Sequence, residues 1–93
     1  MEKINMKVIE PIGIHAKVAA GLVNIASQYK SDIFLTYDEK DANMKSILNI
    51  LALGINNGEY FSITIKGVDE LEASIKMENY LIEKKIAIKV NVF

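Results

Sequence analysis

Apolar and polar residues alternate in three stretches of the chain, at residues 4–8, 33–37 and 61–65. Alternation with a period of two is typical of a strand that buries one of its faces. A short additional strand is expected near residues 42–44, after the polar turn at residues 38–41. The pattern therefore predicts four strands.

Between the strands, apolar residues recur at helical spacing. A first helix is predicted over residues 16–29, and one of its faces is apolar. That face carries Ala19, Leu22, Val23, Ala26 and Tyr29. A second, short helix is predicted over residues 47–53, because Ser46 is a preferred capping residue and Gly54 is a preferred residue just after a helix.

A third helix is predicted to begin at Asp69, another preferred capping residue, and to end near Lys85. Glu72 stands three residues after Asp69 and completes part of a capping box. The residues expected to face the core are Ala73, Met77, Tyr80 and Leu81. The residues expected on the opposite, water-facing side are Leu71, Ile75 and Ile82.

The resulting order is β-α-β-β-α-β-α, an α+β arrangement in which helices cover one face of a sheet. Residues 1–85 are expected to form one small domain. The C-terminal extension, residues 86–93, alternates again and predicts an extra strand. We expect this strand to pair with an exposed sheet edge, either of this chain or of a second copy in a homodimer. The alternative is a frayed terminus beside a mildly apolar surface.

Composition narrows the classes of function. The chain has 93 residues, 51% of them hydrophobic and 25% charged, with a net charge of −1 and no cysteine. The charge gives no reason to expect nucleic acid as a partner. No apolar run approaches the roughly 20 residues of a membrane helix, and the first residues lack the apolar core of a signal peptide. We expect a cytoplasmic protein without membrane insertion, disulfides or cysteine metal sites.

The single histidine, His15, stands where the first strand pattern has ended and the first helical pattern begins. At the start of a helix the N–H groups lack intrahelical acceptors and favour negative charge. The N–H groups of Ala16 and Lys17 are therefore expected to stabilise a phosphoryl group carried on the imidazole. Such a site requires no cofactor and no metal. The alternative is an ordinary surface histidine near a helix end.

Two sequence blocks carry a family resemblance. The first is Gly13-Ile14-His15-Ala16 followed by Lys17-Val18-Ala19, and the second is the block at residues 45–54 around Ser46. Together they resemble the HPr family, the histidine-containing phosphocarriers of the bacterial sugar phosphotransferase system, over residues 4–84. The resemblance implies an open-faced β-sandwich with a four-stranded antiparallel sheet and three helices on one face. The family's usual arginine and proline are here Lys17 and Val18.

The resemblance also implies partners and modifications. His15 is expected to accept a phosphoryl group from enzyme I and to pass it to the IIA components of sugar permeases, so the protein is a carrier and not an enzyme. Ser46 is expected to be phosphorylated by an HPr kinase/phosphorylase, with a transcriptional regulator as a further partner, although a serine there is also explained by capping alone.

An exposed apolar patch is expected to bind these partners, with Ala20 and Gly21 from the first helix. The patch consists of Ile47, Leu48 and Leu51, while Ile50 and Leu53 supply the core face of the same short helix. Periodicity alone leaves each patch residue equally compatible with the core.

Two other functions remain open. The chain fits an HPr-like regulatory module that binds a transcription factor or an enzyme with weak or no phosphotransfer. His15 favours the carrier, whereas Lys17 and Val18 favour the regulatory module. A ligand-binding module of another family with the same order of elements is also open, but it leaves both sequence blocks unexplained.

Overall fold

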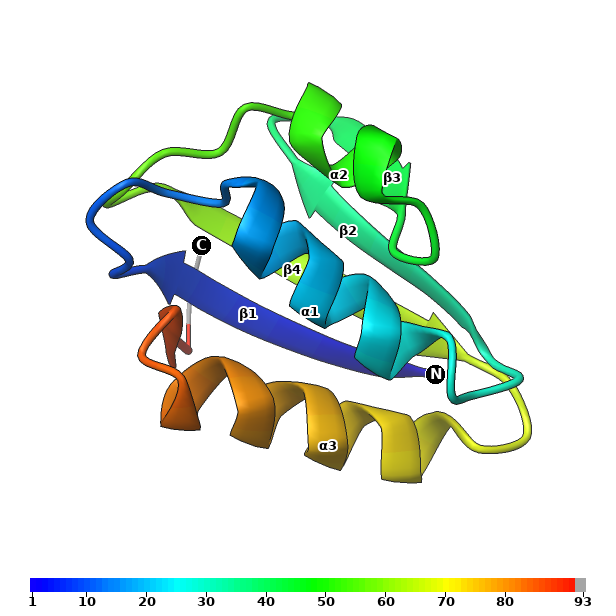
Figure 1. The fold of residues 1–93 in the computed structure, drawn as a ribbon. Coiled ribbons are helices and arrows are strands. Elements are labelled where there is room, and N and C mark those ends of the chain that lie inside the picture. Colours follow the sequence, from blue (N-terminus) through cyan, green and yellow to red (C-terminus); the bar gives the residue numbers. More distant parts are fainter. Residues whose placement is uncertain (92–93) are drawn as a thin grey trace.

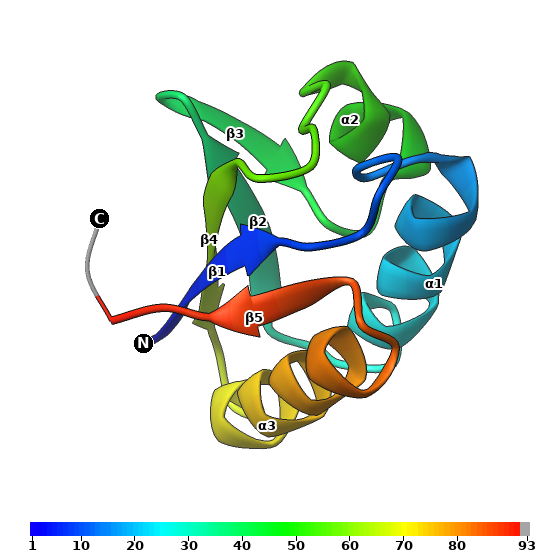
Figure 2. The same ribbon diagram turned by 90° about the vertical axis from the view of Figure 1, so that its left-hand side faces the viewer.

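One antiparallel sheet forms the frame of the molecule in the computed structural model, which describes residues 1–91 (Figure 1). Within these residues the sheet has five strands in the order β3-β2-β4-β1-β5. The strands are β1 (Glu2–Val8), β2 (Asp32–Tyr37), β3 (Lys40–Asn43), β4 (Tyr60–Lys66) and β5 (Ala87–Lys89). Figure 2 shows the helices α1 (Ala16–Ala26), α2 (Ile47–Ala52) and α3 (Glu70–Glu83) on the same face of this sheet.

The alternation seen in the sequence sets the two faces of the sheet. In β1, the apolar residues Ile4, Met6 and Val8 are buried while their neighbours are more exposed. In the register with β4, Ile4 lies opposite Ile63 and Met6 lies opposite Phe61, so the apolar sides of both strands face the helices. The predicted helix-covered α+β sheet is confirmed, with β5 as a fifth strand.

The first helix is three residues shorter than predicted. It ends at Ala26 rather than at Tyr29, and Ser27 occupies the C-cap position. Tyr29 still packs against the core, but from the turn that follows the helix. Lys45 fixes this turn, because its Nζ donates to the carbonyl oxygen of Tyr29 at 2.8 Å. Helical spacing therefore identified a core residue but assigned it to the wrong element.

The hairpin between β2 and β3 also differs from its prediction. The turn consists of Asp38 and Glu39, both with positive φ, at 50° and 64°. Two such residues form the type of turn that matches the twist of paired strands. Lys40 and Asp41, expected in the turn, instead begin β3, and Met44 follows its end as a buried residue. The structure therefore shortens the predicted turn and moves the strand towards the N-terminus.

The start of α3 corrects a predicted cap. Asp69 stands at the N-cap position, but its carboxylate makes no capping hydrogen bond. It accepts hydrogen bonds from the N–H groups of Lys30 and Ser31 and from the Ser31 hydroxyl. These bonds, above all that of the Ser31 hydroxyl, hold the pKa of Asp69 below its usual value. The side chain that reaches back is Glu70, which accepts from Gly67 N–H, and not Glu72.

The two faces of α3 are distributed largely as predicted. Its buried face includes Ala73, Met77 and Leu81, while Tyr80 is half-buried at the edge of the core. On its outer side the side chains of Leu71, Ile75 and Ile82 are exposed. The helical period therefore assigned the orientation of this helix correctly.

The extra C-terminal strand pairs within the chain. Residues of β5 are antiparallel to β1, with Lys7 opposite Ile88 and Val8 opposite Ala87. Ile86 and Ala87 are both buried and Ile88 and Lys89 are both exposed, so burial does not follow the alternation of the sequence here. The predicted strand covered residues 86–93, of which 92 and 93 lie outside the described residues. The extension thus covers the β1 edge of its own sheet.

We expect this strand to stabilise the fold. A chain ending at Lys85 loses the buried side chains of Ile86 and Ala87 and their pairing with β1, which should lower the free energy of unfolding by about 3 kcal/mol. Urea denaturation followed by circular dichroism measures the change. A chain ending at Asn91 keeps every described residue and serves as the reference. Equal stability of the two chains would show that β5 contributes nothing.

Candidate functional site at the start of the first helix

The chain turns sharply between β1 and α1, and backbone hydrogen bonds hold this turn on two sides. The N–H groups of Ile9 and Glu10 both donate to the carbonyl oxygen of Ile86, at 2.9 and 3.1 Å. The N–H of Ile14 donates to the carbonyl oxygen of Ile55 at 2.9 Å. Segments distant in sequence thus fix the turn before the helix begins.

Gly13 is the residue that lets the turn approach the chain after α2. Its φ is +74°, and a Cβ at this position would lie 2.6 Å from the carbonyl oxygen of Ile55. The neighbouring Ile14 side chain is 6% exposed and belongs to the core. Because a buried anchor and a close backbone contact precede His15 directly, the position of its backbone is closely restricted.

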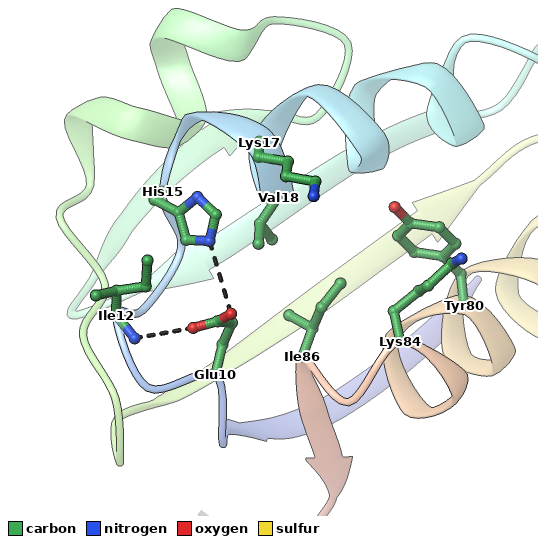
Figure 3. Close-up of a pocket in the computed structure, with 8 residues that line it drawn as sticks. All are labelled: Glu10, Ile12, His15, Lys17, Val18, Tyr80, Lys84 and Ile86. Atoms are coloured by element: carbon green, nitrogen blue, oxygen red, sulfur yellow. Dashed lines mark hydrogen bonds and ion pairs between the residues drawn. The ribbon is translucent and has the colours of Figure 1, made fainter.

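His15 occupies the N-cap position of α1 with an extended backbone, at φ −92° and ψ −179°. Its imidazole makes no capping hydrogen bond, and its side chain is 29% exposed. The ring Nε2 lies 3.7 Å from Oε1 of Glu10 (Figure 3). The other carboxylate oxygen of Glu10 accepts from the N–H of Ile12 at 2.8 Å. The imidazole is therefore accessible from one side and faces a carboxylate on another.

The helix that follows His15 begins with free donors. Among residues 1–91, the N–H groups of Ala16, Lys17 and Val18 have no hydrogen-bond acceptor, and the first N–H to donate back is that of Ala19, to the His15 carbonyl at 2.9 Å. There is no acidic residue in the first turn of this helix. Free N–H groups and the positive end of the helix dipole make this region favourable for an anion.

A cleft opens beside the imidazole, between the start of α1 and the end of α3. Lys17 lines it from α1, and Lys84, the C-cap residue of α3, lines it from the other side, with its ammonium beside Tyr80 in Figure 3. Ile86 and Glu10 line its base. The cleft therefore combines a nucleophilic ring nitrogen with two cations, as the transfer of an anionic group requires.

Comparison with known proteins identifies the family. A family model described as the phosphorylation site of the HPr component of the phosphotransferase system matches residues 2–83. The chain belongs to the HPr family. Its members are phosphocarrier proteins of the phosphotransferase system rather than enzymes.

Individual HPr proteins resemble the chain over nearly its whole length. The phosphocarrier protein HPr of Lysinibacillus sphaericus is 37% identical over 87 residues, which are 94% of this chain and 99% of that protein. Among solved structures, a Mycoplasma histidine-containing phosphocarrier protein has a TM-score of 0.88 at 29% identity, covering 91% of this chain and 97% of its own. The HPr of Thermoanaerobacter tengcongensis has a TM-score of 0.82 at 38% identity, covering 91% and 94%. The HPr fold implied by the two sequence blocks is confirmed.

Ser46, in the second HPr block, caps α2. The Asn49 N–H donates to its Oγ at 3.2 Å. On this helix Leu48 is 78% exposed and Ile47 is 39% exposed, whereas Ile50 is buried. Leu51 is half-buried and packs against the core, so it contributes less to the exposed patch than expected. The roles of Ser46 and of this patch in binding or regulation stay predictions.

The two residues of α1 expected to bind partners lie in different surroundings. Ala20 is exposed, as a contact residue must be. Gly21 is half-buried and lies against α3, where a Cβ would overlap the hydroxyl of Tyr80. Gly21 therefore permits close packing of α1 and α3, and its part in partner binding remains a prediction.

Three residues of the site were not found in the sequence. Glu10 was assigned only to the break after β1, while Tyr80 and Lys84 were placed on a distant helix. Tyr80 and Lys84 line the same cleft as His15 because α3 packs beside α1, and no local sequence pattern shows this packing. The sequence did hold a weak signal for Glu10. Pro11 and Gly13 predict a turn between Glu10 and His15, and such a turn can bring this carboxylate close to the single histidine.

No helix within residues 1–91 is both long enough and apolar enough to cross a membrane.

We expect Gly13→Ala to destabilise the protein more than the same change at a glycine that has open space around its Cα. Its left-handed backbone and the contact with the Ile55 carbonyl oxygen should together cost about 3 kcal/mol. Gly54, at φ +63° with nothing within 4 Å of a Cβ, is the matched control, and its change to alanine should cost about 1 kcal/mol. Thermal unfolding measures both variants. Equal costs would contradict a steric role for Gly13.

Proposed function

We propose that the protein carries a phosphoryl group on His15, which it accepts from enzyme I and passes to the IIA components of sugar permeases. The observation that supports this most directly is the position of a partly exposed imidazole at the start of a helix whose first three N–H groups are free. Lys17 and Lys84 supply positive charge in the same cleft. Cytoplasmic localisation follows from this proposal, because both partners act there.

The transfer needs no cofactor. A lone pair of an imidazole nitrogen attacks phosphorus, the bond from phosphorus to the donor's leaving atom breaks, and that atom keeps the electron pair. The N–H groups of Ala16 and Lys17 then stabilise the phosphate oxygens, and the cations offset the charge that develops during transfer. The reverse sequence at the acceptor removes the group, so the carrier is regenerated.

The surface around α2 is proposed as part of the contact with these partners. Leu48 projects into solvent with Ile47 beside it, and both follow Ser46 directly. An exposed apolar patch on a small protein often marks an interface. Ala20 on the neighbouring helix extends this surface towards His15, because α1 and α2 pack against each other.

Ser46 is proposed as a regulatory phosphorylation site for an HPr kinase/phosphorylase. Ser46 is half-buried at the start of α2, beside the exposed apolar residues. A phosphate there adds a charge of about −2. This charge would weaken docking of apolar partner surfaces without removing the core residues of α2, and would offer a transcriptional regulator a new feature to bind.

A regulatory module with weak phosphotransfer is the second candidate, and the residues after His15 favour it. Lys17 cannot grip a phosphate through two parallel hydrogen bonds as an arginine does. Val18 does not preset the backbone of the first helical turn as a proline does. Rates of transfer, rather than the presence of His15, distinguish the two functions.

Mass spectrometry tests the carrier directly. After incubation with enzyme I and phosphoenolpyruvate, we expect the protein to gain one acid-labile phosphoryl group, and His15→Ala to gain none, since the chain has one histidine. In a separate reaction with HPr kinase/phosphorylase and ATP, we expect one acid-stable group that Ser46→Ala abolishes. An unmodified His15, in a reaction that phosphorylates an HPr from another bacterium, would overturn the carrier proposal.

The lysine after the active-site motif is expected to limit the rate. Lys17→Arg should raise the rate of transfer from enzyme I to His15 by roughly three- to tenfold, because a guanidinium binds two phosphate oxygens at once. Rapid-quench kinetics measure this rate. Lys76→Arg, on the exposed side of α3, is the control and should leave it unchanged. An unchanged or slower Lys17→Arg protein would show that lysine is not the limitation.

A further inference from the structure

We propose that Glu10 is a positioning residue that holds the proton of the neutral His15 ring on Nε2 and leaves Nδ1 free as the nucleophile. The proposal rests on the proposed carrier function for its consequence in transfer. Its structural part, the choice of tautomer, is independent of that function.

Hydrogen bonds hold both the backbone and the carboxylate of Glu10. The backbone N–H of Glu10 donates to the carbonyl oxygen of Ile86, and the backbone carbonyl oxygen of Glu10 accepts from Gly13 N–H at 2.9 Å. Its Oε2 accepts from the N–H of Ile12 at 2.8 Å. With Oε2 occupied in this way, Oε1 is the oxygen that faces the ring of His15. The side chain is only 24% exposed, so little water competes for it.

An ionised carboxylate accepts hydrogen bonds and donates none. A ring that places its N–H towards Oε1 of Glu10 gains from the opposite charges, whereas a ring that places a lone pair there is repelled. The distance of 3.7 Å from Nε2 is longer than a hydrogen bond, so the preference is electrostatic and moderate. The carboxylate therefore favours the Nε2–H tautomer, with the lone pair on Nδ1.

The same carboxylate directs the incoming group. Figure 3 shows Nε2 facing Glu10, while Nδ1 lies on the edge of the ring turned away from it. A phosphoryl donor is anionic, so it is repelled from the Nε2 side and approaches Nδ1. When the Nδ1–P bond forms, the proton stays on Nε2 and the ring becomes positively charged. Glu10 then stabilises this cation, as a carboxylate does for an imidazolium.

The other charged groups in the cleft do not compete for this role. Lys17 and Lys84 line the same cleft, but both are cations and cannot accept a proton from the ring. Glu10 is the single carboxylate among the cleft residues that the structure describes. Its backbone is held by Ile86, so the C-terminal extension, which lies beyond the match to the family model, takes part in fixing it.

The substitution Glu10→Gln separates this role from a structural one. The amide oxygen of glutamine can keep the hydrogen bond from Ile12 N–H, which leaves the amide NH₂ facing His15. A donor at that position favours a lone pair on Nε2 and so moves the ring proton to Nδ1, where it blocks the nucleophile. The turn is retained while the tautomer preference is reversed. Glu10→Ala removes both interactions.

Nitrogen-15 NMR of the imidazole measures the tautomer at about pH 8.5, where an ordinary imidazole is neutral. We expect the ratio of Nε2–H to Nδ1–H in the unmodified protein to exceed that in Glu10→Gln by roughly tenfold, with Glu10→Ala between them. The rate of transfer from enzyme I to His15 should fall about tenfold in Glu10→Gln. Glu83→Gln removes the same charge from an exposed position of α3 and should change neither quantity.

The outcomes separate this inference from the carrier function. Equal tautomer ratios in the unmodified protein and in Glu10→Gln would overturn the role of Glu10, whatever the transfer rate. A shifted ratio in a protein that enzyme I never phosphorylates would support the positioning role while the carrier proposal fails. A reduced transfer rate with an unchanged tautomer ratio would count against the inference.

Discussion

The short turn between β1 and α1 is the constraint on which the site depends. Within a few residues this turn ends a strand, buries Ile14 and begins a helix. Hydrogen bonds to the backbone of two other parts of the chain hold it in place. Ile55 accepts from Ile14 N–H, and Ile86 accepts from the two residues that follow β1. Gly13 allows the first of these approaches, because a side chain would meet the Ile55 carbonyl oxygen. His15 is thereby placed at the N-cap by contacts that involve none of its own side-chain atoms.

This placement explains how so small a domain can carry a reactive group. The N–H groups at the start of α1 are already oriented and unpaired in the described chain, so an arriving phosphate needs no rearrangement of the backbone to be bound. The lysines of the cleft come from two helices, and the carboxylate of Glu10 comes from the turn itself. Binding, charge compensation and orientation of the ring are thus supplied by three different elements around one side chain.

Local sequence patterns predicted the helices and strands well, but they did not predict which of them pack together. Periodicity located β1, β2, β4 and the two faces of α3, whereas β3 begins two residues earlier than expected. The two sequence blocks located His15 and Ser46. The end of α1 was misplaced because Tyr29 packs on the core from a turn, which leaves the same apolar spacing as a helix. The carboxylate of Asp69 was misassigned as a cap because its donors, at Lys30 and Ser31, lie 39 and 38 residues away. Tyr80 and Lys84 joined the site through packing of helices, which depends on the whole fold.

The central claim is that the free N–H groups at the start of α1 hold the phosphoryl group on His15. Amide NMR spectra of the protein before and after phosphorylation by enzyme I test it most directly. The account predicts that the amide protons of Ala16 and Lys17 move downfield as they donate to phosphate oxygens, while that of Ala19, which already donates to the His15 carbonyl, moves little. Phosphorylation that leaves the Ala16 and Lys17 signals in place would contradict it.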